Sequence, residues 1–358
     1  MRCCRSSTAW MLAMAMIAGP TVARCAAAPP VFQQTAATSS LPQWDGDPVP
    51  APGDVPSSAA AAHPADTAQK QSNGSYLLRQ DAFEVRLNVS VVDGSGAPVN
   101  SLPQEAFHVY EDGVPQQIVS FRHEDLPVSL GLLIDSSGSM YDKRDAVSKA
   151  SIDLVQLSNP QDEAFLVDFN TEPYLDADFT NSVAKLRQGL SHLDPKGGTA
   201  LYDALLASAD YMTKKAKHPK QVLLIITDGE DTASSATLEE TIRRVQDLDG
   251  PAIYAVGLLF GSDVDKREAR HAREVLEELC EQTGGQAYFP RSLKEVDGVA
   301  AEVAQDIRTQ YTLTYHSTNP PSNGGFRQVH IEVKAKGYHD IQARTRAGYY
   351  PHLAATKH

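Results

Sequence analysis

The segment at residues 130–141 reads LGLLIDSSGSMY, and the fold around it follows from this stretch. An apolar run ends at Asp135, and hydroxyl side chains follow at Ser137 and Ser139, which gives the pattern D-x-S-x-S. An apolar run that stops at a carboxylate is typical of a buried strand whose end reaches the rim of a sheet. Carboxylate and hydroxyl oxygens, without thiolate or imidazole, are the ligands that a hard cation such as Mg²⁺ prefers.

Strand and helix patterns alternate on the C-terminal side of this segment. Strands are expected at residues 164–170, 174–179, 221–227, 252–258 and 286–289, and helices at 142–157, 183–193, 200–215, 238–248, 267–283 and 293–309. Apolar strands that alternate with helices are typical of a parallel sheet covered on both faces. The predicted fold class is therefore α/β, with a Rossmann-like, doubly wound and mostly parallel sheet over residues 128–308.

The two flanking segments have the two-residue period of half-buried strands instead. Before the sheet, residues 83–92 read FEVRLNVSVV, with further strands expected at 107–110 and 118–123. After it, strands are expected at 311–315, 327–333 and 341–345. Neither segment is long enough to bury a core alone, so we expect 309–350 to pair with 79–127 in a β-sandwich-like unit. The alternative is that each segment extends the α/β sheet at an edge.

Two further loops fit the same end of the predicted sheet. Thr199 follows Gly197 and Gly198 at the start of a helix, and Asp228 ends the apolar strand at 221–227. In open α/β sheets, ligands bind at the carboxyl ends of the strands. We therefore expect one metal site made by Asp135, Ser137, Ser139, Thr199 and Asp228. The alternative for each of the three loops is that its polar side chains only cap the following helix.

The order D-x-S-x-S, then T, then D resembles the metal-ion-dependent adhesion site of von Willebrand factor A domains. The resemblance covers roughly residues 128–308. It implies that Ser137, Ser139 and Thr199 ligate Mg²⁺ directly or through water. It also implies that Asp135 and Asp228 act mainly through water and hold the hydroxyls. Mn²⁺ and Ca²⁺ also favour oxygen ligands and stay open as alternatives. Glu230 and Asp231 would either feed a second cation or face solvent.

The flanking segments resemble exported "VWFA-related" proteins of Acidobacteria-type bacteria. The matching stretches are VRLNVSVVDGSGAPVNSLPQEAFHVYEDGVPQQIVSF before the A domain and YTLTYHSTNPPSNGGFRQVHIEVKAKG after it. This resemblance implies an exported bacterial protein but defines no ligand.

Neutral hydroxyls around a cation leave it electrophilic, so that it can take a carboxylate from a partner as its last ligand. The predicted function is therefore metal-dependent, adhesion-type capture of an Asp or Glu side chain of another protein. A periplasmic scaffold or assembly factor for an envelope complex is the second hypothesis. In a third, the metal is only structural.

The sequence offers little for an enzyme. Ser137 and Ser139 lack the G-x-S-x-G flanks of a nucleophile elbow, and the chain has no GxxxxGK[ST] phosphate loop and no H-E-x-x-H zinc motif. A Mg²⁺-dependent phosphohydrolase is a remote alternative, because Asp135 ends a strand as a phosphorylated aspartate would. Such an enzyme needs a second acid two residues later, where this chain has Ser137.

Charge and the N-terminus bound the partners and the compartment. The formal net charge of the 358 residues is -13, which argues against nucleic acid as a partner. Residues 1–28 read as a signal peptide, and 29–78 as a disordered linker rich in Ala, Pro and Ser, which would tether the protein in the envelope. The mature chain is expected to be periplasmic or extracellular, without a transmembrane segment. Lipid anchoring at Cys25 is the alternative, which Arg24 before it disfavours.

Overall fold

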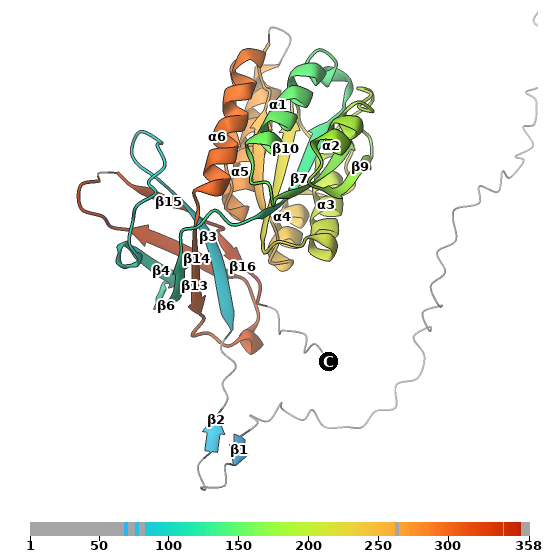
Figure 1. Ribbon diagram of the computed structural model, residues 1–358. Helices are drawn as coiled ribbons and strands as arrows, with labels where there is room; N and C mark the ends of the chain where they lie inside the picture. The colour runs from blue at the N-terminus through green and yellow to red at the C-terminus, as the bar shows by residue number, and fades with distance from the viewer. Residues whose placement is uncertain (1–67, 71–75, 79–82, 262–264, 339, 352–358) are drawn as a thin grey trace, which may run out of the picture. The chain divides into compact units, whose positions relative to one another are not determined.

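The computed structural model describes residues 68–70, 76–78, 83–261, 265–338 and 340–351 (Figure 1). All the described residues belong to one compact unit, residues 66–358. The predicted signal peptide, Cys25 and most of the predicted linker lie outside the described residues. Among the helices of the described part, none is long and apolar enough to cross a membrane.

A six-stranded sheet forms the centre of the α/β domain, which we define as residues 128–308. Its strand order is β12-β11-β10-β7-β8-β9, and only the edge strand β9 runs antiparallel to its neighbour. Every residue of β7 is buried, as the apolar run predicts. The strands are β7 (Val128–Asp135), β8 (Glu163–Phe169), β9 (Pro173–Thr180), β10 (Lys220–Thr227), β11 (Ala252–Gly257) and β12 (Ala287–Tyr288).

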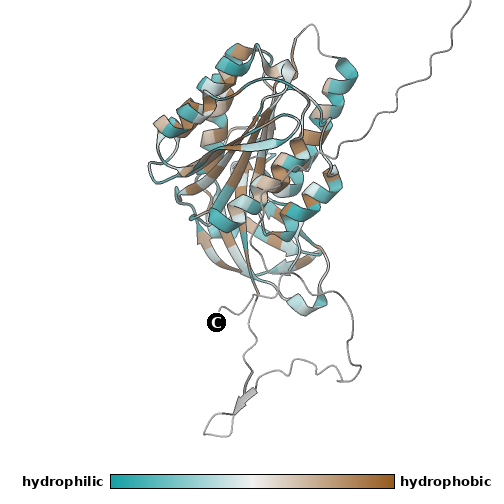
Figure 2. Cartoon of the chain, turned by 90° about the vertical axis from the view of Figure 1, so that its right-hand side faces the viewer, coloured by the Kyte–Doolittle hydropathy of each residue, from teal (hydrophilic) through white to brown (hydrophobic). Residues whose placement is uncertain are grey.

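Helices cover both faces of this sheet. Apolar side chains of α1, α2 and α6 form one core with one face, and those of α3, α4 and α5 form a second core with the other. Figure 2 shows the hydrophobic strands between these helices, whose outer surfaces are largely hydrophilic. The helices are α1 (Arg144–Leu157), α2 (Val183–Leu190), α3 (Leu201–Lys215), α4 (Leu238–Asp247), α5 (Lys266–Thr283) and α6 (Val296–Arg308). The predicted doubly wound α/β fold is confirmed.

The flanking strands form a separate β-sandwich. One sheet has the order β15-β3-β13-β6 and the other β16-β14-β4-β5, so strands from before and after the α/β domain lie side by side in both. The strands are β3 (Glu84–Val92), β4 (Phe107–Glu111), β5 (Val114–Gln116), β6 (Ile118–Arg122), β13 (Tyr311–His316), β14 (Arg327–Val333), β15 (Gln342–Arg344) and β16 (Gly348–Tyr349). The predicted sandwich is confirmed, and the edge-extension alternative is wrong for the described strands.

A third apolar core fills the sandwich and holds one ionic network. The Glu111 carboxylate accepts hydrogen bonds from the hydroxyls of Tyr315 (2.7 Å), Tyr349 (2.8 Å) and Ser317 (2.6 Å). It also pairs with the guanidinium of Arg327 at 3.4 Å, and both side chains are 1% exposed. Since β4 carries Glu111 and β14 carries Arg327, the pair joins the N-terminal segment to the C-terminal one.

One short element lies where no secondary structure is expected. β1 (Ala68–Lys70) and β2 (Tyr76–Leu78) pair antiparallel inside the predicted linker. The run Tyr76–Leu78 has aromatic and aliphatic residues with strand propensity, which the composition of the whole segment hides. The remaining elements are short 3-10 turns: η1 (Gln104–Ala106), η2 (Gly138–Met140), η3 (Leu293–Glu295) and η4 (Pro321–Asn323).

Candidate metal site

Two neighbouring parallel strands bring the predicted aspartates to one edge of the sheet. Ile134 of β7 pairs with Ile226 of β10, so Asp135 and Asp228 follow at the carboxyl ends of adjacent strands. This is the edge at which open α/β sheets bind ligands. Both residues are largely buried, with 2% and 7% of their surface exposed.

Asp135 uses both carboxylate oxygens to hold the surrounding loops. Its Oδ1 accepts a hydrogen bond from the Ser137 backbone N–H at 2.8 Å, and its Oδ2 accepts one from the Thr227 hydroxyl at 2.6 Å. Burial raises the pKa of Asp135 to about 6, although the hydrogen bonds from Thr227 and Ser137 act in the opposite direction. Asp135 therefore links its own loop to the end of β10.

The two serines lie against each other and against the second carboxylate. The hydroxyl oxygens of Ser137 and Ser139 are 3.1 Å apart, and the Ser139 hydroxyl donates to Asp228 Oδ1 at 2.7 Å. Adjacent oxygens around an octahedral Mg²⁺ are about 3 Å apart, given its metal–oxygen distance of 2.0–2.1 Å. The serine pair thus has the spacing that two ligands of one cation require.

The loop that carries Thr199 is fixed to the same place by main-chain contacts. The Lys196 N–H donates to the Ser136 carbonyl at 2.8 Å, and the Gly138 N–H donates to the Gly197 carbonyl at 3.4 Å. Gly197 has φ of 74°, and a Cβ there would lie 2.6 Å from the Thr171 hydroxyl, so only glycine fits. These contacts hold Lys196 and Gly197 against the serine loop, while the N–H of the buried Thr199 donates to the Thr232 hydroxyl at 3.0 Å.

The capping alternatives meet a mixed geometry. The Ser137 side chain makes no cap hydrogen bond to η2, although Asp135 accepts the Ser137 backbone N–H, and the N-cap position of α3 is Ala200, which has no polar side chain. Asp231 serves α3 instead, because its Oδ2 accepts from the Tyr202 N–H at 3.2 Å. Asp231 thus binds the start of a helix, which neither the second-cation nor the solvent interpretation anticipates.

Sequence reasoning missed two residues that contact the candidate site. Thr227 immediately precedes Asp228 and bonds Asp135, and Lys143 forms an ion pair with Asp228 through Oδ2. The ion pair joins residues that are 85 positions apart, so no local pattern reports it. One feature of the sequence could have drawn attention to Lys143: it is a lysine at the start of a predicted helix, where a positive charge is unfavourable.

The donor set fits a hard divalent cation. It contains hydroxyl and carboxylate oxygens only, and among the described residues no group of three or more His, Cys, Asp or Glu is arranged around a common point. Such a site suits Mg²⁺, Mn²⁺ or Ca²⁺ and does not suit zinc, which prefers nitrogen and sulfur.

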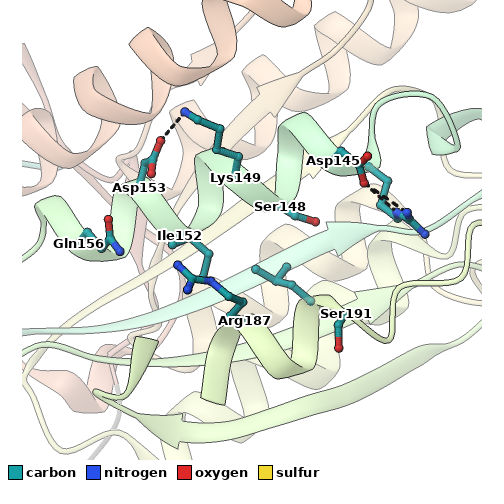
Figure 3. Close-up of a pocket in the computed structure, with 10 residues that line it drawn as sticks. Asp145, Ser148, Lys149, Ile152, Asp153, Gln156, Arg187 and Ser191 are labelled. Carbon is teal, nitrogen blue, oxygen red and sulfur yellow. Dashed lines mark hydrogen bonds and ion pairs between the residues drawn. The ribbon is translucent and has the colours of Figure 1, made fainter. Parts of the chain in front are cut away.

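A groove of about 500 Å³ lies between α1 and α2 (Figure 3). None of the five predicted metal residues lines it. Its lysine is already paired, because Lys149 donates to Asp153 at 2.7 Å, and Arg144 likewise pairs with Asp145. These charged groups of the groove are therefore already paired within the chain, and we take the loops at the sheet edge as the candidate site.

Comparison with known families agrees with the fold. The family model described as von Willebrand factor type A domain matches residues 130–230, a range that contains all five predicted metal residues. The chain therefore contains a von Willebrand factor type A domain, as the sequence resemblance predicts. Among curated proteins, none matches the chain.

Several solved structures resemble the chain at low sequence identity. The PilB minor pilin from Streptococcus sanguinis is 14% identical with a TM-score of 0.41, and the match covers 52% of this chain and 62% of the pilin. A von Willebrand factor type A protein from Catenulispora acidiphila is 14% identical with a TM-score of 0.42, covering 76% of this chain and 74% of that one. BatB from Bacteroides thetaiotaomicron, described as a conserved hypothetical protein, is 15% identical with a TM-score of 0.39, covering 50% and 98%.

Proposed function

We propose that this protein is an exported binding module that captures a carboxylate of a partner protein through a divalent cation. Mg²⁺ is the first candidate for this cation. Ser137, Ser139 and Thr199 would hold the cation. Asp135 and Asp228 would ligate it mainly through water and would fix the hydroxyls. A partner Asp or Glu side chain would complete the coordination.

The observation that carries this proposal is the convergence of three loops at one edge of the sheet. Hydrogen bonds link the loop that carries Asp135, Ser137 and Ser139 to Asp228 after β10. Main-chain hydrogen bonds hold the loop at 196–199 against the first of these loops. Helix capping would not require this convergence. A cation that three loops share explains it directly.

The charge balance of the site favours an anionic partner group. The formal charges of Asp135 and Asp228 offset those of one divalent cation, and Lys143 adds a positive charge beside them. A cation held mostly by neutral hydroxyls keeps its attraction for a carboxylate. Hydrogen bonding supports binding over catalysis, since both carboxylate oxygens of Asp135 already accept hydrogen bonds.

Binding of the metal is tested first, by titrating EDTA-treated full-length protein with MgCl₂, MnCl₂ or CaCl₂ in a calorimeter. The double variant Ser137→Ala/Ser139→Ala should lose divalent binding. Ser191→Ala is the matched control, because Ser191 is an exposed serine whose hydroxyl only donates to the Gln188 carbonyl of its own helix end. Equal metal affinity of wild type and the double variant would refute the proposed site.

Partner capture is tested next, with envelope extract passed over immobilised protein in Mg²⁺ or EDTA. Retained proteins should be released by EDTA and should be absent with the double variant. Retention that survives both treatments would exclude metal-bridged capture. If EDTA only lowers the melting temperature while retention is unchanged, the metal is structural.

The cellular location separates adhesion from the scaffold hypothesis. Surface exposure of the protein favours adhesion, and retention in the periplasm favours assembly of an envelope complex. Protease treatment of intact cells, followed by detection of the chain, distinguishes the two.

A further inference from the structure

Lys143 occupies a position that the rules of helix formation disfavour. It directly precedes α1, where Ser, Thr, Asp and Asn are preferred and where the helix dipole opposes a positive charge. Arg144 follows it and adds a second cation at the same helix end. A residue that conflicts with its local setting is expected to have a role elsewhere in the structure.

The partner of Lys143 is the buried carboxylate at the centre of the candidate site. Its ammonium group pairs with Asp228 Oδ2, while Asp228 Oδ1 accepts the hydrogen bond from Ser139. The side chain of Lys143 is 15% exposed and that of Asp228 is 1% exposed. The pair is therefore largely shielded from water, which strengthens its electrostatics compared with a surface pair.

We propose that the Lys143 ammonium is a built-in counter-cation that competes with the divalent metal for Asp228. This inference rests on the proposed function and specifies how the same site is regulated. Without metal, Lys143 neutralises the carboxylate and keeps the loops assembled. With metal, its positive charge lowers the affinity for the cation, so that the cation binds weakly until an anionic ligand joins it.

The test compares Lys143→Met with wild type in the full chain. Methionine keeps an unbranched side chain of similar length and removes the charge. We expect the dissociation constant for Mg²⁺ to fall about tenfold, since one unit charge close to the cation is removed in a poorly hydrated site. Lys143→Arg keeps the charge and should stay within about twofold of wild type.

A matched control removes the same charge from the same helix. Lys149 is exposed on α1 and pairs with Asp153 and Asp297, so Lys149→Met should leave the Mg²⁺ affinity unchanged.

A second readout is the melting temperature. In EDTA, Lys143→Met should melt below wild type, because Asp228 is left without its counter-charge. Mg²⁺ should then raise its melting temperature more than that of wild type.

The outcomes separate the two proposals. If wild type binds Mg²⁺ and Lys143→Met binds it equally or more weakly, the counter-cation role is refuted while the metal site stands. If neither protein binds a divalent cation, the proposed function fails, and Lys143–Asp228 is a structural ion pair only. Tighter binding by Lys143→Met together with a lower melting temperature in EDTA supports the proposal.

Discussion

Lys220 is an ionisable side chain that is buried in the fold. It is the first residue of β10, is 4% exposed, and donates a hydrogen bond from Nζ to the Ile307 carbonyl near the end of α6. Burial lowers the pKa of its ammonium group from 10.5 to about 8. Between these two values the unfolded chain binds more protons than the folded chain, so the stability that depends on Lys220 rises with pH.

This pH dependence is measurable against a variant without the amine. From about pH 7.5 to about pH 9.5, the free energy of unfolding of wild type should rise by about 2 kcal/mol relative to that of Lys220→Met. Urea denaturation at both pH values measures the difference. The exposed Lys149→Met serves as control and should follow wild type at both. Parallel behaviour of wild type and Lys220→Met would show that Lys220 keeps an ordinary pKa in the fold.

At the scale of elements, the packing at the centre of the sheet requires a glycine at position 131 of β7. A Cβ at Gly131 of β7 would lie 2.4 Å from Leu223 Cδ2 and 2.5 Å from Phe165 Cζ, which belong to the two neighbouring strands. Gly131→Ala should therefore lower the free energy of unfolding by about 1–3 kcal/mol through overpacking. Thermal or urea denaturation measures this change.

A second glycine gives the control of opposite sign. Gly298 lies in α6, and a Cβ there meets no described atom within 4 Å. Gly298→Ala should raise the free energy of unfolding by about 0.5–1 kcal/mol, because alanine is the better helix former. If both substitutions shift stability in the same direction, the packing explanation for Gly131 is wrong.

The long elements follow from sequence patterns, whereas two of the short strands, β5 and β16, do not. The burial of β7 could be predicted because its apolar run has no polar interruption before Asp135. β5 and β16 have three and two residues, too few for a period to show, and exist because β4 and β14 offer open edges. The position of the candidate residues Asp135 and Asp228 at one edge of the sheet could be predicted from spacing. The contacts of Lys143 and Thr227 could not, since they arise only when β10 lies beside β7.

At the scale of the whole molecule, one buried ion pair joins segments that the α/β domain separates in sequence. Arg327→Met would leave Glu111 charged and unpaired in the sandwich core, at a cost of about 3–5 kcal/mol. Adding Glu111→Gln should recover part of this loss, because a neutral amide is buried more cheaply than an unpaired carboxylate.

Urea denaturation of both single variants and of the double variant tests this coupling in a double-mutant cycle. Loss of stability in the double variant equal to the sum of the two single losses would mean that the two charges do not depend on each other.

The interleaved strands also determine how the protein would bear a mechanical load. Suppose that the chain is pulled at the start of β3 while a partner holds the α/β domain. The force is then transmitted through the sandwich to the connections that join it to the α/β domain. β13 begins at Tyr311, which pairs with Val89, and β6 ends at Arg122, which pairs with Thr312. Both connections therefore leave the sandwich at the end opposite to Glu84. The antiparallel hydrogen bonds between β3 and β13 lie across the direction of pull, so they are loaded together in shear and do not open one at a time.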